Sequence, residues 1–73
     1  MKIIERKDLC IGSVISYSYP NSGQVLHGTI IHLGLGLAAR HAVWVRCLDG
    51  ANTGRVEGIL LQYITGVTSY ASR

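Results

Sequence analysis

The sequence predicts a small all-β domain, a barrel of five short strands with one turn of 3₁₀ helix. Three observations lead to this prediction. Apolar and polar residues alternate with a period of two in several segments, which is typical of half-buried strands. Nine glycines and one proline supply turns between those segments, which recur at spacings of about ten residues. Apolar residues nowhere recur with the 3.6-residue period of an amphipathic helix.

Residues 12–19 form the first predicted strand, because apolar and aromatic residues alternate there with serines. A turn follows at residues 20–23, where Pro restricts φ while Asn and Gly tolerate positive φ. The second predicted strand, residues 24–33, is rich in aliphatic side chains. Gly28 in its middle indicates a bulge or a sharp bend, which a small barrel needs at its corners.

The third predicted strand, residues 41–48, has the clearest alternation, with Val43 and Val45 on one face and Trp44 and Arg46 on the other. Asp-Gly at the start of the next turn is a strong hairpin signal.

The C-terminal third completes the barrel. After the turn at residues 49–54, residues 55–59 form a fourth strand and residues 64–70 a closing strand, with the 3₁₀ turn between Leu60 and Tyr63. Alternation then predicts a core, with the register around Gly28 as its weakest part. The predicted core consists of Ile15, Tyr17, Val25, Ile30, Val43, Val45, Val56, Ile59, Ile64 and Val67.

Four stretches of the sequence resemble the SH3-like barrels of ribosomal KOW-type modules, Tudor-type domains and small accessory subunits. The resemblance rests on Ile11 to Tyr17, His27 to Ile31, Val43 to Arg46 with Asp49-Gly50, and Leu61 to Val67. It implies one SH3-like domain over residues 1–73, with residues 1–9 as a flexible arm and 70–73 as a flexible tail. It says little about function, because such barrels host unrelated activities.

The composition indicates a folded domain with few surface charges. Its residues are 48% hydrophobic and 15% charged, which is enough apolar surface for a core. The formal net charge of +3 is a thinner excess than the basic stripe of a dedicated nucleic-acid binder. Because few charges cover the outside, we expect a homo-oligomer or a protein partner. The N-terminus lacks the apolar run of a signal peptide, so we expect a cytoplasmic protein with no membrane partner.

No motif indicates a cofactor or a metal. Residues 34–39 match G-x-G-x-x-A, but the next strand begins too soon for the helix that would receive a pyrophosphate. Cys10 and Cys47 lack a C-x-x-C spacing and have no zinc-like spacing with the three histidines, although a disulfide between them remains an option. Of these histidines, His27 and His32 fall on opposite faces unless a bulge intervenes. We therefore expect no cofactor, no metal and no enzymatic activity.

Trp44, the only tryptophan, is the centre of the candidate binding surface. If Val43 and Val45 face the core, Trp44 and Arg46 point outward together, and both residue types are enriched at binding hot spots. The alternative is that Trp44 covers a second, small apolar cluster beneath the long loop or the termini. The further candidate binding residues are Arg40, Arg55, Leu35 and Leu37.

These residues lead to three hypotheses. The first is a non-enzymatic binding or assembly module, an accessory or regulatory protein that binds a protein partner or itself through the exposed Trp/Arg face. The alternative is a nucleic-acid-binding module or small transcription-associated regulator, whose affinity would fall steeply with salt. The third is an enzyme whose active site forms only at the subunit interface of a homo-oligomer.

Overall fold

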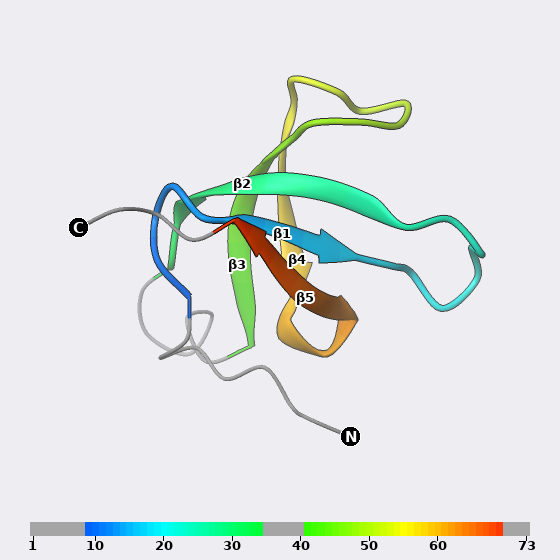
Figure 1. The fold of residues 1–73 in the computed structure, drawn as a ribbon, viewed down its shortest axis with the longest axis horizontal. Helices are drawn as coiled ribbons and strands as arrows, with labels where there is room; N and C mark the ends of the chain where they lie inside the picture. The colour runs from blue at the N-terminus through cyan, green and yellow to red at the C-terminus, as the bar shows by residue number, and fades with distance from the viewer. Residues whose placement is uncertain (1–8, 35–40, 70–73) are drawn as a thin grey trace.

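The computed structural model describes residues 9–34 and 41–69, and five antiparallel strands form one sheet in the order β4-β3-β2-β1-β5 (Figure 1). The elements are β1 (Val14–Tyr17), β2 (Leu26–His32), β3 (Ala42–Cys47), β4 (Val56–Leu60), the 3₁₀ turn η3 (Leu61–Tyr63) and β5 (Ile64–Ser69). The all-β class and the position of the 3₁₀ turn are confirmed. The flexible arm and tail predicted from sequence fall almost entirely outside the described residues.

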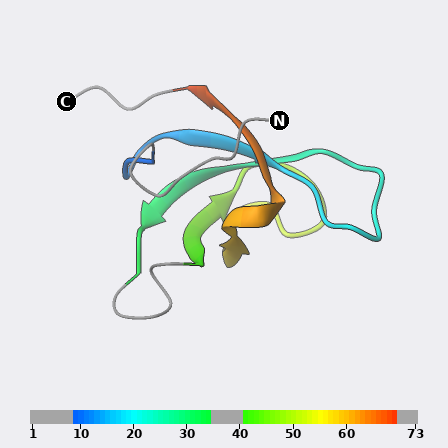
Figure 2. The ribbon, with the colours of Figure 1, turned by 90° about the horizontal axis from the view of Figure 1, so that it is seen from below.

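The sheet is bent so that all five strands contribute to one core (Figures 1 and 2). The buried apolar residues are Leu9, Ile15, Tyr17, Ile30, Val43, Val45, Cys47, Ile59 and Ile64. The sheet does not close into a barrel, because no ladder joins its two edge strands β4 and β5 in the described part of the chain. The turn η3 redirects the chain between these strands, and β5 pairs with β1 instead. The predicted architecture is thus corrected to an open, coiled sheet.

Gly28 allows β2 and β3 to approach closely rather than marking a bulge. It pairs with Cys47 in an unbroken part of the ladder, and a Cβ placed on it would lie 2.8 Å from Cγ2 of Val45. Because the alternation continues through Gly28, Leu26 packs against the core and Val25 is 52% exposed. The sequence-based placement of Val25 in the core was therefore wrong.

The irregularity in β2 comes later, between Ile30 and His32. Ile30 pairs with Val45 but His32 pairs with Trp44, so the residue of β2 between them has no paired residue on β3. Since directly paired residues share a face, His32 lies on the outer face with Trp44. His27 lies three positions before the buried Ile30, ahead of the shift. Because this number is odd, His27 faces the opposite side from Ile30 and also lies on the outer face.

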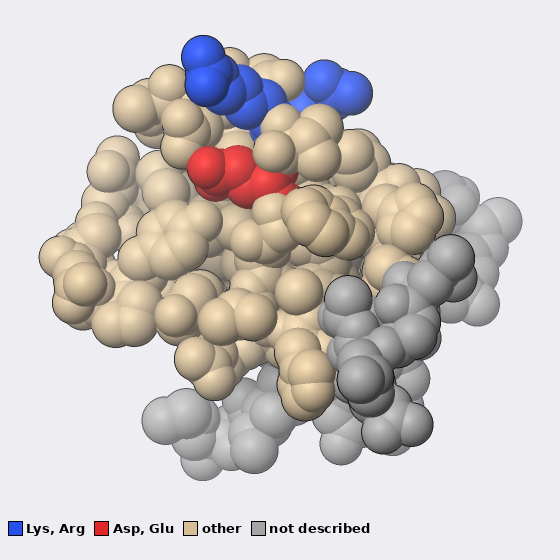
Figure 3. Space-filling view, turned by 180° about the vertical axis from the view of Figure 1, so that it is seen from behind, with Lys and Arg blue, Asp and Glu red and all other residues tan. Residues whose placement is uncertain are grey.

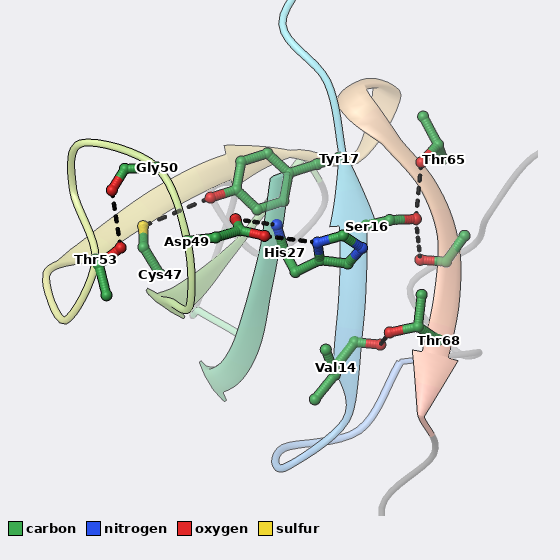
Figure 4. Close-up of polar contacts among 11 residues, drawn as sticks. Val14, Ser16, Tyr17, His27, Cys47, Asp49, Gly50, Thr53, Thr65 and Thr68 are labelled. Carbon is green, nitrogen blue, oxygen red and sulfur yellow. Dashed lines mark hydrogen bonds and ion pairs between the residues drawn. The ribbon is translucent and has the colours of Figure 1, made fainter. Parts of the chain in front are cut away.

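Two threonines of β5 occupy the irregular positions in its ladder with β1. The register shifts between Val14 and Ile15, and again between Ser16 and Tyr17, which passes over Thr68 and Thr65. The Thr65 hydroxyl lies 2.8 Å from that of Ser16, and the Thr68 hydroxyl donates to the Val14 carbonyl at 3.2 Å (Figure 4). Side-chain hydrogen bonds thus replace ladder contacts where β5 bends.

Most of the predicted core is buried, and its second error has a simple cause. Val56 is 47% exposed, whereas Ile59 is fully buried. Residues three positions apart on a strand face opposite sides, so the two could not both enter the core. Leu9 and Cys47 are buried as well and were absent from the predicted core, and Val67 is half-buried against it.

We expect Gly28→Ala to lower the free energy of unfolding by about 1–3 kcal/mol, the usual effect of overpacking a core. The new Cβ would meet Cγ2 of Val45 at 2.8 Å and the Arg46 carbonyl at 3.3 Å, and the carbonyl belongs to the backbone. Urea unfolding measures the change. Gly23→Ala is the matched control, because nothing lies within 4 Å of its Cβ position. Equal stabilities of the two variants would contradict the packing described for Gly28.

Candidate protein-binding surface

Trp44 lies on the outer face of the sheet, away from the core. Within β3 the side chains of Val43 and Val45 are fully buried, whereas Trp44 is 41% exposed. Arg46, two positions further along the strand, is exposed on the same face. The alternation expected from the sequence is therefore present, and β3 presents Trp44 and Arg46 side by side along one face.

The indole of Trp44 fills the space that the absent side chain of Gly58 leaves on the neighbouring strand. The two residues are directly paired. A Cβ on Gly58 would lie 2.9 Å from Cζ3 of Trp44 and 3.2 Å from Cε3 and Cη2, so the six-membered ring rests on the backbone of β4. Val56 and Leu60 flank Gly58 on this face and are 47% and 38% exposed. We call Trp44, Arg46, Val56 and Leu60 the Trp44 face.

Arg46 belongs to the Trp44 face, whereas Arg55 does not. Nη1 of Arg46 donates to the carbonyl oxygen of Gly54 at 3.2 Å, and Arg46 pairs with Val56 across the ladder. Arg55 precedes Val56 by one position, so alternation directs its side chain to the side of Glu57. Figure 3 shows the described basic side chains gathered at one end of the molecule with an acidic neighbour.

The remaining candidates divide into those outside the described residues and those that the sequence analysis missed. Leu35, Leu37 and Arg40 fall outside the described ranges. Val56 and Leu60 were missed as surface residues. Both lie an odd number of positions from Ile59, so alternation from that core residue would have placed them on the outer face, and β4 pairs with β3 without a register shift that would change this.

A small polar network lies beside the core, beneath the loop that joins β3 and β4. The Tyr17 hydroxyl donates to Sγ of Cys47 at 3.5 Å (Figure 4). That thiol donates to Oε2 of Glu57 at 3.5 Å. Nδ2 of Asn52 donates to Oε1 of Glu57 at 2.8 Å. Burial raises the pKa of the Cys47 thiol, so it stays protonated and is a poor nucleophile. Cys47 is thus a buried structural thiol rather than half of a disulfide.

Three tyrosines, Tyr17, Tyr19 and Tyr63, contact one another in series. The rings of Tyr17 and Tyr19 meet edge to face, with centroids 5.9 Å apart and planes at 81°. Tyr19 and Tyr63 meet in the same way, at 5.5 Å and 66°. Tyr17 is fully buried, and its pKa is raised, chiefly by burial. The ring faces therefore pack within the fold.

The histidines have separate local partners. The backbone amide of His27 donates to Oδ1 of Asp49 at 2.8 Å, and its ring Nδ1 lies 2.8 Å from Oδ2 (Figure 4). His32 accepts a hydrogen bond at Nδ1 from the Gly34 amide, at 2.7 Å. The carbonyl of His41 accepts from the amide of Leu61. Asp49 thus ties the start of β2 to the loop that follows β3.

The described part of the chain has neither a pocket nor a group of three or more side chains arranged to hold a metal ion. None of its helices is long and apolar enough to cross a membrane. Comparisons with protein-family models, curated proteins and solved structures return no match to this chain. The Trp44 face, where an exposed tryptophan lies beside two exposed aliphatic residues, is the candidate site.

We expect Gly58→Val to displace the indole of Trp44 toward solvent. A Cβ at this position would overlap the far edge of the ring, which can swing away on an exposed face. Tryptophan emission should shift to longer wavelength, while the free energy of unfolding changes by less than about 1 kcal/mol because valine favours strands. Gly66→Ala serves as the control, since its Cβ would only touch Oγ of Ser16 at 3.5 Å. An unchanged emission maximum in Gly58→Val would contradict the contact.

Asp49 should make folding stability depend on pH in the acid range. The hydrogen bonds from the His27 ring and then from its backbone amide lower the pKa of Asp49. The unfolded value is about 3.9, so the stabilisation is complete above that pH and is lost as the pH falls through the lower folded value. In Asp49→Asn this part of the dependence should vanish. Urea unfolding from about pH 2 to pH 6 measures it, and equal slopes in both proteins would refute the assignment.

Proposed function

We propose that this chain is a non-enzymatic protein-binding or assembly module that binds its partner through the Trp44 face. The observation that carries the proposal is the placement of Trp44, which rests on Gly58 but remains 41% exposed between two exposed aliphatic residues. Tryptophan and arginine dominate binding hot spots because each offers a large contact area together with a polar group.

The contact of Trp44 with the backbone at Gly58 lowers the entropic cost of binding. Because Gly58 limits where the ring can go, little conformational freedom is lost when a partner covers the indole. Val56 and Leu60 extend the apolar area along β4, and their burial by a partner would add hydrophobic stabilisation. Arg46, held by the Gly54 carbonyl, is placed to form a charge-assisted hydrogen bond with a carboxylate of the partner.

Five antiparallel strands, with η3 between the last two, support our proposal that the architecture is SH3-like, with its sheet left open. That architecture serves many unrelated binding functions, so it favours a binding role without naming the partner. Nucleic-acid binding is the weaker alternative. Arg46 and Arg55 are the only Lys or Arg residues in the described part of the chain, which is too few for the basic stripe of a nucleic-acid binder.

Selection from a random peptide library displayed on phage tests the proposal. We expect peptides enriched on the immobilised protein to lose at least tenfold in affinity for Trp44→Ser, because the central contact is removed. The substitution should cost about 2 kcal/mol of stability, since the side chain is half-exposed. Far-UV circular dichroism verifies folding, and Gln62→Ala, on an exposed residue of η3, is the matched control.

Two results would overturn this function. The first is that Trp44→Ser leaves both peptide affinity and any self-association of the protein unchanged. The second is a saturable quenching of Trp44 fluorescence by oligonucleotides that weakens steeply with salt, which would favour the nucleic-acid alternative.

A further inference from the structure

Within residues 9–34 and 41–69, no strand pairs with the outer edge of β4, and this edge has hydrogen-bonding groups directed outward. The Cys47 amide donates to the Arg55 carbonyl, and the Leu61 amide donates to the His41 carbonyl. Backbone groups in an antiparallel strand alternate in direction, so the odd-numbered residues of β4 bond toward β3. The N–H and C=O groups of Val56, Gly58 and Leu60 therefore point away from the sheet. These three residues are exposed.

The two edges of the sheet differ in how open they are to another strand. β5 pairs with β1 through two register shifts, and bulges of this kind hinder the addition of a strand. β4 pairs with β3 without a shift, contains no proline and has one charged residue, Glu57. A regular edge beside an exposed apolar face is a template for pairing.

We propose that a second copy of this chain adds edge to edge at the β4 border of the Trp44 face, through antiparallel pairing of β4 with β4. This inference goes beyond the proposed function, because edge pairing extends the Trp44 face and does not cover it. A twofold axis through Gly58 places the two glycines opposite each other and Val56 opposite Leu60 of the second copy. The outward N–H and C=O groups of all three residues then find partners across the axis.

Side chains and charges are compatible with this register. Glu57 lies opposite Ile59 of the second copy, so the only charged residue of β4 does not meet its own copy. On the outer face Val56 packs beside Leu60 of the second copy. Each indole rests over its own Gly58, so the two indoles converge above the paired glycines. The two Trp44 faces join into one continuous surface.

Only a small apolar area is available to strengthen the dimer. Trp44, Val56 and Leu60 are each less than half exposed, so together they offer roughly 250 Å², well short of the roughly 800 Å² per partner of a standard interface. Backbone hydrogen bonds supply the rest of the binding. We therefore expect a reversible dimer with a dissociation constant between about 10 μM and 1 mM.

Sedimentation equilibrium over that concentration range tests the inference with Leu60→Pro and Leu60→Thr. Leu60 has φ −65° and ψ 141°, a conformation that proline adopts, and its N–H points outward. Proline thus removes a donor from the free edge without removing a bond to β3. Leu60→Thr also shortens the side chain but keeps the donor. We expect dimerisation to weaken at least tenfold in Leu60→Pro and less than threefold in Leu60→Thr.

Amide hydrogen exchange of the native protein provides an independent measurement. The amides of Val56, Gly58 and Leu60 should become protected as the protein concentration rises, while exchange in β5 stays unchanged. A monomer at about 1 mM, equal association of the two Leu60 variants, or unprotected β4 amides would each overturn the inference. If the protein is monomeric yet selects Trp44-dependent peptides, the proposed function stands and only the edge pairing is wrong.

Discussion

The packing of Val45 into the space above Gly28 is the contact on which the rest of the structure depends. A Cβ at Gly28 would lie 2.8 Å from Cγ2 of Val45, so this closeness requires glycine and fixes the pairing of β2 with β3. With Val45 directed inward, alternation directs Trp44 outward. There a second glycine, Gly58 of β4, leaves room for the indole. β3 is thus packed against a glycine of each neighbouring strand, one on each face of the sheet.

The same constraint explains why the candidate site lies on β3 and β4. The inner face of β3 is committed to the core, and its continuation at Cys47 meets the network with Tyr17 and Glu57. The polar groups of that network form hydrogen bonds with one another, which stabilises the fold. The outer face carries the exposed tryptophan and ends at a regular edge. Binding by surface contact fits this distribution.

The register shifts of the sheet lie in β5 and β2. The shifts in β5 are accompanied by hydroxyl bonds from Thr65 and Thr68 to β1, so bending that strand leaves few unsatisfied groups. The shift in β2 after Ile30 keeps His32 on the outer face opposite Trp44. β4 pairs with β3 without such a shift, so its edge is regular. The two edges of the sheet therefore differ in how readily each can pair with another strand.

Local pattern determined the all-β class, the strand positions and the outward direction of Trp44, because each follows from a period of two within one strand. It could not determine which residue interrupts that period. The shift in β2 follows Ile30 rather than Gly28, so Val25 was assigned to the wrong face. The spaces above Gly28 and Gly58 are filled by side chains of a neighbouring strand, which a pattern within one strand does not reveal. Only the tertiary structure decided that the sheet stays open and which edge is free, because both depend on how distant strands pair.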